Sequence, residues 1–286
     1  MIHIATVHFR SDQWIDVQKR YLERHLKSPF RVYAWLNEVP PVPPGTFHYS
    51  CSEPVTAHSV KLNLLADLIY FDSNRDDDIL IFLDGDAFPV ADIEPLIREK
   101  LATHKLIAVQ RLENDGDIQP HPCFCVTTVR FWRSIKADWS EGHQWINKSG
   151  VVTTDVGGNL LKLLGDTGTD WYPLRRSSGI SAHPVLFGIY GGLVYHHGAG
   201  FRNPVTRGDM AELKIGWGDR IRAVFPARVE RVAQRRLRRK LEAMIGPVSE
   251  QVFRQIQASP QFFKDHLAPE RSSPVLTACR PPLLQT

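Results

Sequence analysis

One stretch of the sequence predicts the fold most clearly: Ile79-Leu80-Ile81-Phe82-Leu83-Asp84-Gly85-Asp86. Its five consecutive apolar residues are typical of a strand that is buried on both faces, as in a parallel sheet. Two carboxylates follow at the point where this strand ends. Because ligands of open α/β sheets bind at the carboxyl ends of strands, we interpret the two acids as part of a binding site.

The acidic pair is a candidate cation site. Two like charges beside a core are costly to bury unless a positive group lies between them. Gly85 keeps the backbone between Asp84 and Asp86 slim, so the pair can hold a divalent cation through oxygen ligands, and the cation can in turn hold phosphates. The alternative is an ordinary solvated loop that carries two acids.

A second segment with suitable residue types follows a late apolar strand: His196-His197-Gly198-Ala199-Gly200-Phe201-Arg202. Either histidine is a candidate nitrogen ligand that completes the cation site. The backbone amides of Gly198 and Gly200 are expected to approach phosphate oxygens, and Arg202 to pair with phosphate through two N–H groups. Paired histidines alone are more often structural, so this interpretation depends on the acidic pair.

Length and composition favour a soluble globular protein. The chain has 286 residues, of which 43% are hydrophobic and 23% charged, which suits one large α/β domain with an appendage. The N-terminus has no signal-peptide pattern, and no apolar run is long enough to cross a bilayer. The four cysteines lack the spacing of a zinc site, and we expect a cytoplasmic protein that keeps them reduced.

Strand and helix patterns alternate along the first three quarters of the chain. Period-two or continuous apolar runs predict strands at 2–8, 30–36, 79–83, 105–111, 124–129, 171–174 and 192–197. Helical spacing predicts helices at 12–26, 58–71, 92–101, 131–138 and 154–164. This alternation favours an α/β domain over residues 1–225, with a mostly parallel sheet flanked by helices.

Residues 226–286 differ in character. The net charge of +4 is unevenly distributed, because basic residues are concentrated in one stretch with helical apolar spacing and a basic face: Arg228, Arg231, Arg235, Arg236, Arg238, Arg239 and Lys240. We expect a basic helical extension followed by a loose tail. The segment 228–245 is a candidate for peripheral contact with an anionic membrane. The alternative is a surface helix whose apolar stripe packs on the main domain.

With both motifs in view, the chain resembles nucleotide-sugar-dependent glycosyltransferases of the GT-A fold, in particular the group of glycogenin and the lipopolysaccharide galactosyltransferases. Asp84-Gly85-Asp86 matches the Asp-x-Asp motif of that fold, which binds manganese or magnesium and the donor diphosphate. His197-Gly198-Ala199-Gly200 matches the late His-x-x-Gly segment, whose histidine is the third metal ligand in the family. Arg202 stands near the family's phosphate-binding lysine. The family's Lys-Pro-Trp ending is replaced by Arg202-Asn203-Pro204, which keeps His196 as a rival ligand.

The resemblance also implies a fold and further site residues. It implies a GT-A, Rossmann-like α/β domain with a C-terminal helical extension. Strand one ends at Thr6-Val7-His8, which would lie beside the nucleotide base, and Lys61 would meet base or diphosphate. Asp155 matches an acid near the donor sugar and acceptor, and it is the candidate catalytic residue. The structural alternatives are a solvent-exposed lysine and a helix cap, respectively.

The predicted function is therefore transfer of a sugar from a UDP- or GDP-sugar to a hydroxyl on a glycan or lipid-linked acceptor, in surface glycan synthesis at the inner membrane face. One alternative is a haloacid dehalogenase-type Mg²⁺-dependent phosphatase, although Phe88 stands where that motif has Thr or Val. Another is a non-catalytic GT-A-like binding protein. Nucleic-acid binding is disfavoured because the basic residues cluster in one helix without interleaved aromatic residues.

Overall fold

The computed structural model describes residues 1–179, 186–200 and 227–266. Its main sheet has seven strands in the order β10-β6-β7-β4-β1-β2-β3. The strands are β1 (Ile2–Phe9), β2 (Phe30–Asn37), β3 (Tyr49–Cys51), β4 (Ile79–Asp84), β6 (Leu106–Val109), β7 (His121–Thr128) and β10 (Tyr172–Leu174). Neighbouring strands are parallel except where β7 pairs with β4 and β6. This is the mostly parallel α/β sheet that the sequence predicts.

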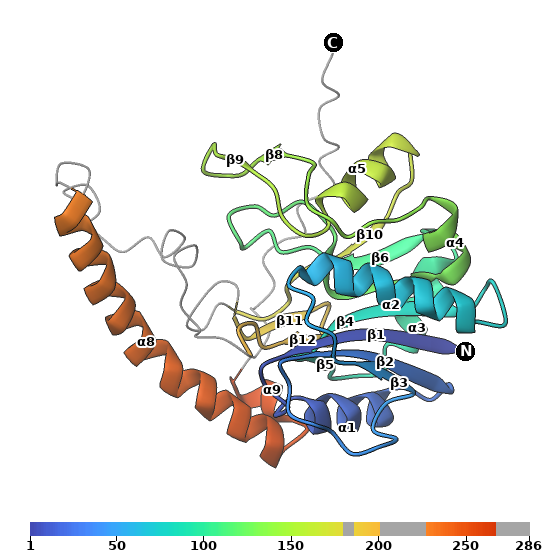
Figure 1. The fold of residues 1–286 in the computed structure, drawn as a ribbon, viewed down its shortest axis with the longest axis horizontal. Helices are drawn as coiled ribbons and strands as arrows, with labels where there is room; N and C mark the ends of the chain where they lie inside the picture. Colours follow the sequence, from blue (N-terminus) through green and yellow to red (C-terminus); the bar gives the residue numbers. More distant parts are fainter. Residues whose placement is uncertain (180–185, 201–226, 267–286) are drawn as a thin grey trace, which may run out of the picture.

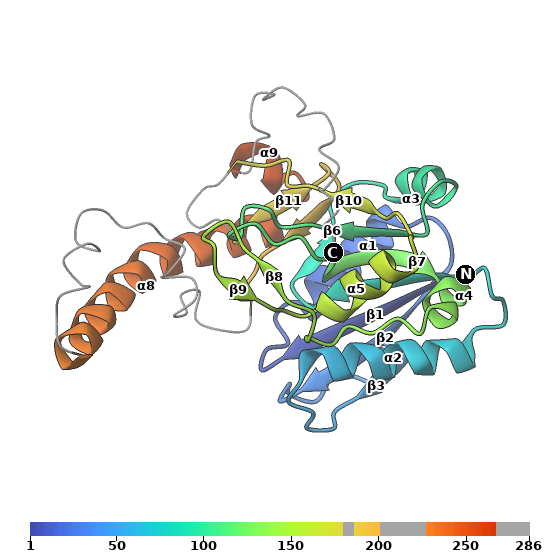
Figure 2. The same ribbon diagram turned by 90° about the horizontal axis from the view of Figure 1, so that it is seen from above.

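Helices cover both faces of this sheet (Figures 1 and 2). One face packs against α2 (His58–Asp72), α4 (Val129–Ser134) and α5 (Gly158–Asp166), and the other against α1 (Ile15–His25) and α3 (Glu94–Leu101). Strand β1 explains the two layers, because its alternate side chains divide between them. Ala5 and Val7 join the core with α2, whereas Ile2 and Ile4 join the core with α1 and α3.

A small antiparallel sheet stands at the carboxyl end of the main one. It consists of β11 (Gly188–Tyr190), β12 (Val194–His196) and β5 (Ala87–Pro89). β5 begins directly after Asp86, and the register sets His196 opposite Ala87. The two motifs of the sequence, far apart along the chain, are therefore hydrogen-bonded neighbours. A further hairpin of β8 (Trp145–Ile146) and β9 (Val152–Thr153) lies beside α5.

The C-terminal part contains α8 (Ala227–Ala258) and α9 (Phe262–His266). In its second half, α8 buries Leu241 and Ile245 in a cluster that also contains Phe88 and Tyr195, whereas Met244 is exposed. This half of the helix therefore shares a core with the sheet domain. The first half extends away from it (Figure 1), and the side chains of 227–234 and 237 lie outside the described residues, as do the expected domain boundary at 225 and the predicted loose tail.

Four of the five predicted helices begin at a different residue, and α1 begins at Ile15 and α4 at Val129. α3 begins at Glu94, with the Asp92 carboxylate accepting a hydrogen bond from the Glu94 N–H (3.1 Å). α5 begins at Gly158, because Gly157 at the preceding position has a left-handed φ of 92°. Asp155 therefore lies ahead of the helix, and its side chain accepts from the Val156 N–H (2.8 Å). The alternative role for Asp155, a cap of this helix, was wrong.

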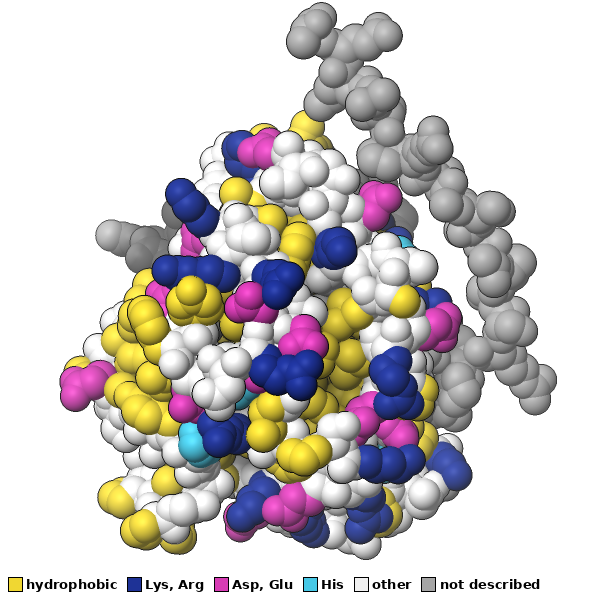
Figure 3. Space-filling view, turned by 90° about the vertical axis from the view of Figure 1, so that its right-hand side faces the viewer, with side chains coloured by type: hydrophobic (Ala, Val, Ile, Leu, Met, Phe, Trp, Pro, Cys, Tyr) yellow, Lys and Arg dark blue, Asp and Glu magenta, His cyan; other side chains and the backbone are white. Residues whose placement is uncertain are grey.

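Figure 3 shows one face of the molecule, on which Lys and Arg side chains are interspersed with Asp and Glu. Ion pairs among the described residues include Arg130 with Asp76 (3.0 Å) and Arg133 with Asp67 (3.1 Å). Among the described helices, none is both long and apolar enough to cross a membrane.

Candidate metal centre and binding cleft

The Asp84-Gly85-Asp86 turn packs directly on the end of β1. The Gly85 N–H donates to the Val7 carbonyl at 3.1 Å. A Cβ atom at position 85 would lie 2.7 Å from that carbonyl oxygen and 2.7 Å from His8 Nδ1, which is closer than real Cβ contacts allow. The glycine is therefore required to bring the acidic turn against β1.

A buried glutamine fixes the same turn from the other side. The Gln18 side-chain amide donates to the carbonyls of Asp84 and Ala87, each at 2.8 Å, and its oxygen accepts from the Thr6 hydroxyl at 3.1 Å. Gln18 comes from α1, so the sheet and this helix together hold the backbone on both sides of the acidic pair. Nothing in the sequence pattern singled out this residue.

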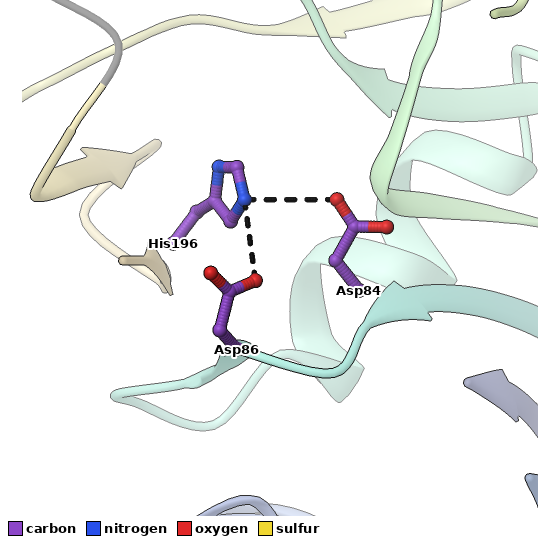
Figure 4. A group of neighbouring side chains, drawn as sticks. All are labelled: Asp84, Asp86 and His196. Carbon is purple, nitrogen blue, oxygen red and sulfur yellow. Dashed lines mark ion pairs between the residues drawn. The ribbon is translucent and has the colours of Figure 1, made fainter. Parts of the chain in front are cut away.

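The structure brings one histidine to the two carboxylates. His196 Nε2 lies 3.4 Å from Asp86 Oδ1 and 3.6 Å from Asp84 Oδ2 (Figure 4). The three ligand atoms all lie within 4.8 Å of one another. Two ligands about 2.1 Å from one ion, at right angles, are roughly 3 Å apart. The spacing therefore suits a single small cation.

His196 and Asp86 form a buried pair of opposite charge. Burial alone would lower the pKa of His196, but Cys123 and the Asp86 carboxylate outweigh it and hold that pKa well above its usual range. For Asp86, burial would raise the pKa, but His196, His197 and the Gly200 N–H hold it below its usual range. Without a cation, the imidazolium supplies the positive charge that the carboxylates need.

The donor set fits a divalent cation such as Mn²⁺ or Mg²⁺. The two carboxylates are the oxygen ligands that Mn²⁺ and Mg²⁺ prefer, and the imidazole favours the softer Mn²⁺ of the two. Asp84 Oδ1 is buried, makes no hydrogen bond within the described part of the chain, and lies 3.2 Å from His58 Nε2. Asp84 thus has one oxygen toward His196 and the other toward His58, a contact that the sequence did not predict.

His197, the histidine favoured by the family spacing, lies elsewhere. Its ring packs 4.6 Å from that of Trp14, measured between centroids, and its two nitrogens are 2.8 Å from the hydroxyls of Tyr195 and Ser249. Burial lowers the pKa of His197 to about 4, so the ring is neutral. Both ring nitrogens are thus used within the protein, and His196 is the better candidate ligand.

The glycine segment after β12 contacts Asp86 directly. The Gly200 N–H donates to Asp86 Oδ2 at 2.9 Å, so this amide is engaged by the acidic pair in the structure. The Gly200 carbonyl accepts from Trp14 Nε1, also at 2.9 Å. Gly198 and Gly200 line the cleft. Arg202, the expected phosphate partner, lies outside the described residues.

The acidic pair opens into a cavity of about 340 Å³, within the range of small-molecule pockets. Val7 and His8 line it, whereas Thr6 is buried beneath, bonded to Gln18. Burial lowers the pKa of His8 to about 4, and its Nε2 atom has no hydrogen-bond partner among the described residues. This orphaned polar atom beside the cleft is a candidate contact for a ligand.

Lys61 lines the cleft and is almost fully buried. Its side chain is on α2 and only 3% exposed, so the structural alternative of a solvent-exposed lysine was wrong. Its Nζ lies 5.3 Å from the centroid of the Phe9 ring and makes no hydrogen bond or ion pair with any described residue. Burial lowers its pKa, with Glu38 opposing the shift. A lysine that is almost fully buried without an anionic partner among the described residues is costly, which makes Lys61 a candidate ligand contact.

Asp155 lies in the same cavity, opposite a partly buried arginine. Its carboxylate is 42% exposed and lies 3.7 Å from the Arg111 guanidinium, which also contacts Asp117 at 3.3 Å. Arg111, His58 and His121 line the cavity, and the sequence reasoning missed all three. Arg111 follows β6 and His58 opens α2, so their places at element ends were the available signal.

No protein-family model matches the chain, and the search of curated proteins gave no match. Solved structures that resemble it include the apo form of the glycosyltransferase GlyE from Streptococcus pneumoniae TIGR4, with 14% identity and a TM-score of 0.33, over 47% of this chain and 36% of GlyE. The chain thus spans about a third of that relative's length.

Two further solved structures resemble the chain over a larger share of their own length. The galactosyltransferase LgtC, in complex with donor and acceptor sugar analogues, shows 13% identity and a TM-score of 0.33, over 60% of this chain and 73% of LgtC. The catalytic domain of Drosophila β1,4-galactosyltransferase 7 shows 10% identity and a TM-score of 0.38, over 69% of this chain and 71% of that domain. At these values the likeness carries no argument, and the function below rests on this chain's own residues.

Proposed function

We propose that the chain is a glycosyltransferase that takes a nucleoside diphosphate sugar as donor, requires Mn²⁺ or Mg²⁺, and transfers the sugar to a hydroxyl acceptor. One observation carries the proposal. Asp84, Asp86 and His196 converge, within 4.8 Å of one another, in a cleft that also contains the amine of Lys61, which has no anionic partner within the described ranges. A cation site beside a buried amine is suited to a polyanion such as a diphosphate.

The donor would lie along the cleft from β1 to Asp155. We assign the base, uracil or guanine, to the end of β1 at Val7 and His8, with Lys61 beside it or the diphosphate. Cleft-lining Gly198 would face the diphosphate. When bound, a divalent cation supplies Lewis-acid neutralisation of the charge on the departing diphosphate. The fixed positions of Asp84, Asp86 and His196 mean that little reorganisation accompanies that charge.

Asp155 is the proposed catalytic residue. It is accessible in the cleft and lies near the Arg111 guanidinium, which holds its carboxylate in place. If the configuration at the anomeric carbon is inverted, the Asp155 carboxylate takes the acceptor proton. If it is retained, the same carboxylate orients the donor sugar. In the first case the carboxylate contacts the acceptor hydroxyl, and in the second it contacts the donor sugar.

The class of acceptor is inferred from the exposed basic residues of α8. We infer a glycan or lipid-linked acceptor of a surface-polysaccharide pathway, reached at the inner, cytoplasmic face of a membrane. The support is the run of exposed basic residues on α8: Arg235, Arg236, Arg238, Arg239 and Lys240. Such a cluster favours anionic lipid surfaces.

The phosphatase alternative is less well supported. It requires Asp84 to act as a nucleophile with a free carboxylate oxygen. His58 lies 3.2 Å from one oxygen and His196 3.6 Å from the other, so both face imidazoles.

A thermal-shift screen of nucleoside diphosphates and their sugars, with and without Mn²⁺, tests the proposal. A ligand that binds the folded state stabilises it by about 2.7 kcal/mol at 100 times Kd, and so raises its unfolding temperature. We expect a shift with uridine or guanosine diphosphates only when Mn²⁺ is present, and Mn²⁺-dependent release of the diphosphate from the matching sugar. Asp86→Asn should lose both effects. Absence of any shift with every nucleoside diphosphate in Mn²⁺ would refute the proposal.

A further inference from the structure

A hydrogen-bonded chain connects α8 to the wall of the cleft. Ser249, on the half of α8 that packs on the domain, has its hydroxyl 2.8 Å from His197 Nε2. His197 Nδ1 lies 2.8 Å from the Tyr195 hydroxyl, which is fully buried. His197 is therefore held at both ring nitrogens, once by its own strand segment and once by the C-terminal helix.

His197 is in turn bonded to the acidic turn. Its backbone N–H donates to the Asp86 carbonyl at 3.1 Å, and its side chain packs against Trp14. Trp14 Nε1 donates to the Gly200 carbonyl, and the Gly200 N–H donates to Asp86 Oδ2. His197 is thus connected to Asp86 in two ways. Its backbone N–H binds the Asp86 carbonyl, and its ring is linked to the Asp86 carboxylate through Trp14 and Gly200.

The fit around Gly200 shows how tightly this layer is packed. A Cβ atom there would lie 2.5 Å from Trp14 Nε1 and 2.7 Å from Asp86 Oδ2. A small movement of Trp14 or His197 must therefore move Gly200, Asp86 or both, because packed interiors do not deform without cost.

We propose that Ser249 is a positioning residue: through His197 it fixes Asp86 and His196, so that the second half of α8 is needed for a fully formed cation site. The inference rests on the cation site of the proposed function but does not require sugar transfer. His197 is not one of the three candidate metal ligands, and the inference assigns it the role of holding Asp86 and His196 in place. It also assigns α8 to the machinery of the cleft.

The test is the affinity for Mn²⁺ alone, measured by calorimetry or electron paramagnetic resonance on the full chain, together with the unfolding temperature. Outer partners of metal ligands typically contribute about 10–100-fold to affinity, and Ser249 acts one step further away, so we expect Ser249→Ala to weaken Mn²⁺ binding by about 3–10-fold. Tyr195→Phe, which removes the other partner of His197, should act in the same direction. Ser249→Thr keeps the hydroxyl and should restore the affinity.

Val252→Ala is the matched control, because Val252 is buried on the same helix in the cluster of Trp14 and Tyr195, but its side chain has no polar group to join these hydrogen bonds. It should lower the unfolding temperature more than Ser249→Ala and leave Mn²⁺ affinity unchanged. The proposal is overturned if Ser249→Ala binds Mn²⁺ as the parent does, or if Val252→Ala weakens binding equally. If the variants change the affinity for Mn²⁺ as expected but the parent protein transfers no sugar, the proposed function is refuted and this inference stands.

Discussion

His196 Nε2 lies 3.4 Å from Asp86 Oδ1 because β12 pairs with β5 in a register that sets His196 opposite Ala87. Two segments from distant parts of the chain therefore form one site through backbone pairing. The side chains have little freedom to separate, since Asp86 is 6% and His196 5% exposed.

Cation binding should depend on pH through His196. The pKa of this histidine is raised in the folded protein, so both ring nitrogens stay protonated up to a higher pH than usual, and the proton on Nε2 competes with the cation. In the absence of cation, the same shift stabilises the fold below the unfolded pKa, and this stability is lost as the pH rises through the folded pKa. Mn²⁺ affinity measured by calorimetry should therefore keep rising as the pH is raised above about 6.5, the usual pKa of histidine. An affinity independent of pH over that range would contradict this account of His196.

Lys61→Met separates a functional from a structural lysine. Because the amine is buried without an ion-pair partner among the described residues, its removal should raise the unfolding temperature of the ligand-free protein. The same change should weaken binding of the nucleoside diphosphate by about 10–100-fold, the value of a charge-assisted hydrogen bond. Thermal unfolding and calorimetry check the two effects. A loss of stability with unchanged nucleotide affinity would make Lys61 structural.

Gly85→Ala tests the close approach of the acidic turn to β1. The added Cβ meets the Val7 carbonyl at 2.7 Å, so we expect a loss of about 1–3 kcal/mol in the free energy of unfolding and weaker Mn²⁺ binding. Gly165→Ala is the control, since nothing lies within 4 Å of a Cβ at this helical position. It should stabilise by about 0.5–1 kcal/mol. Equal tolerance of both substitutions in urea unfolding would show that the turn has room to move.

Asp155→Asn should leave donor binding intact and slow transfer. If the carboxylate takes the acceptor proton, kcat should fall by about 10²–10⁴-fold while the affinity for the nucleoside diphosphate is unchanged. A smaller fall, with a raised KM for the donor sugar, would indicate the orienting role instead. Steady-state kinetics distinguish these results, and undiminished turnover would remove Asp155 from the site.

Much of the fold was predictable because its signals are local. The apolar run ending at Asp84 predicts β4, and helical spacing predicts α2 to within a residue of its observed bounds. The strands β3, β5, β8, β9 and β11 were missed because each has only two or three residues, too few for a periodic pattern. The early start expected for α5 ignored the left-handed backbone at Gly157.

The site was predictable at its motifs and not in its long-range contacts. The acids and the late histidine segment could be recognised from their positions after strands. Whether His196 or His197 faces the acids depends on the pairing of β12 with β5, and β5 leaves too short a pattern to predict. His58, Arg111 and Gln18 reach the cleft through tertiary packing, which no spacing in the sequence encodes.

The central claim is that a cation held by Asp84, Asp86 and His196 binds a nucleoside diphosphate. Calorimetric titration of uridine and guanosine diphosphates into the full chain, with and without Mn²⁺, and into its His196→Ala variant, tests it most directly. The account predicts binding of one of the two that requires Mn²⁺ and weakens at least about 10-fold in His196→Ala. Equal binding without Mn²⁺, or by the variant, would contradict it.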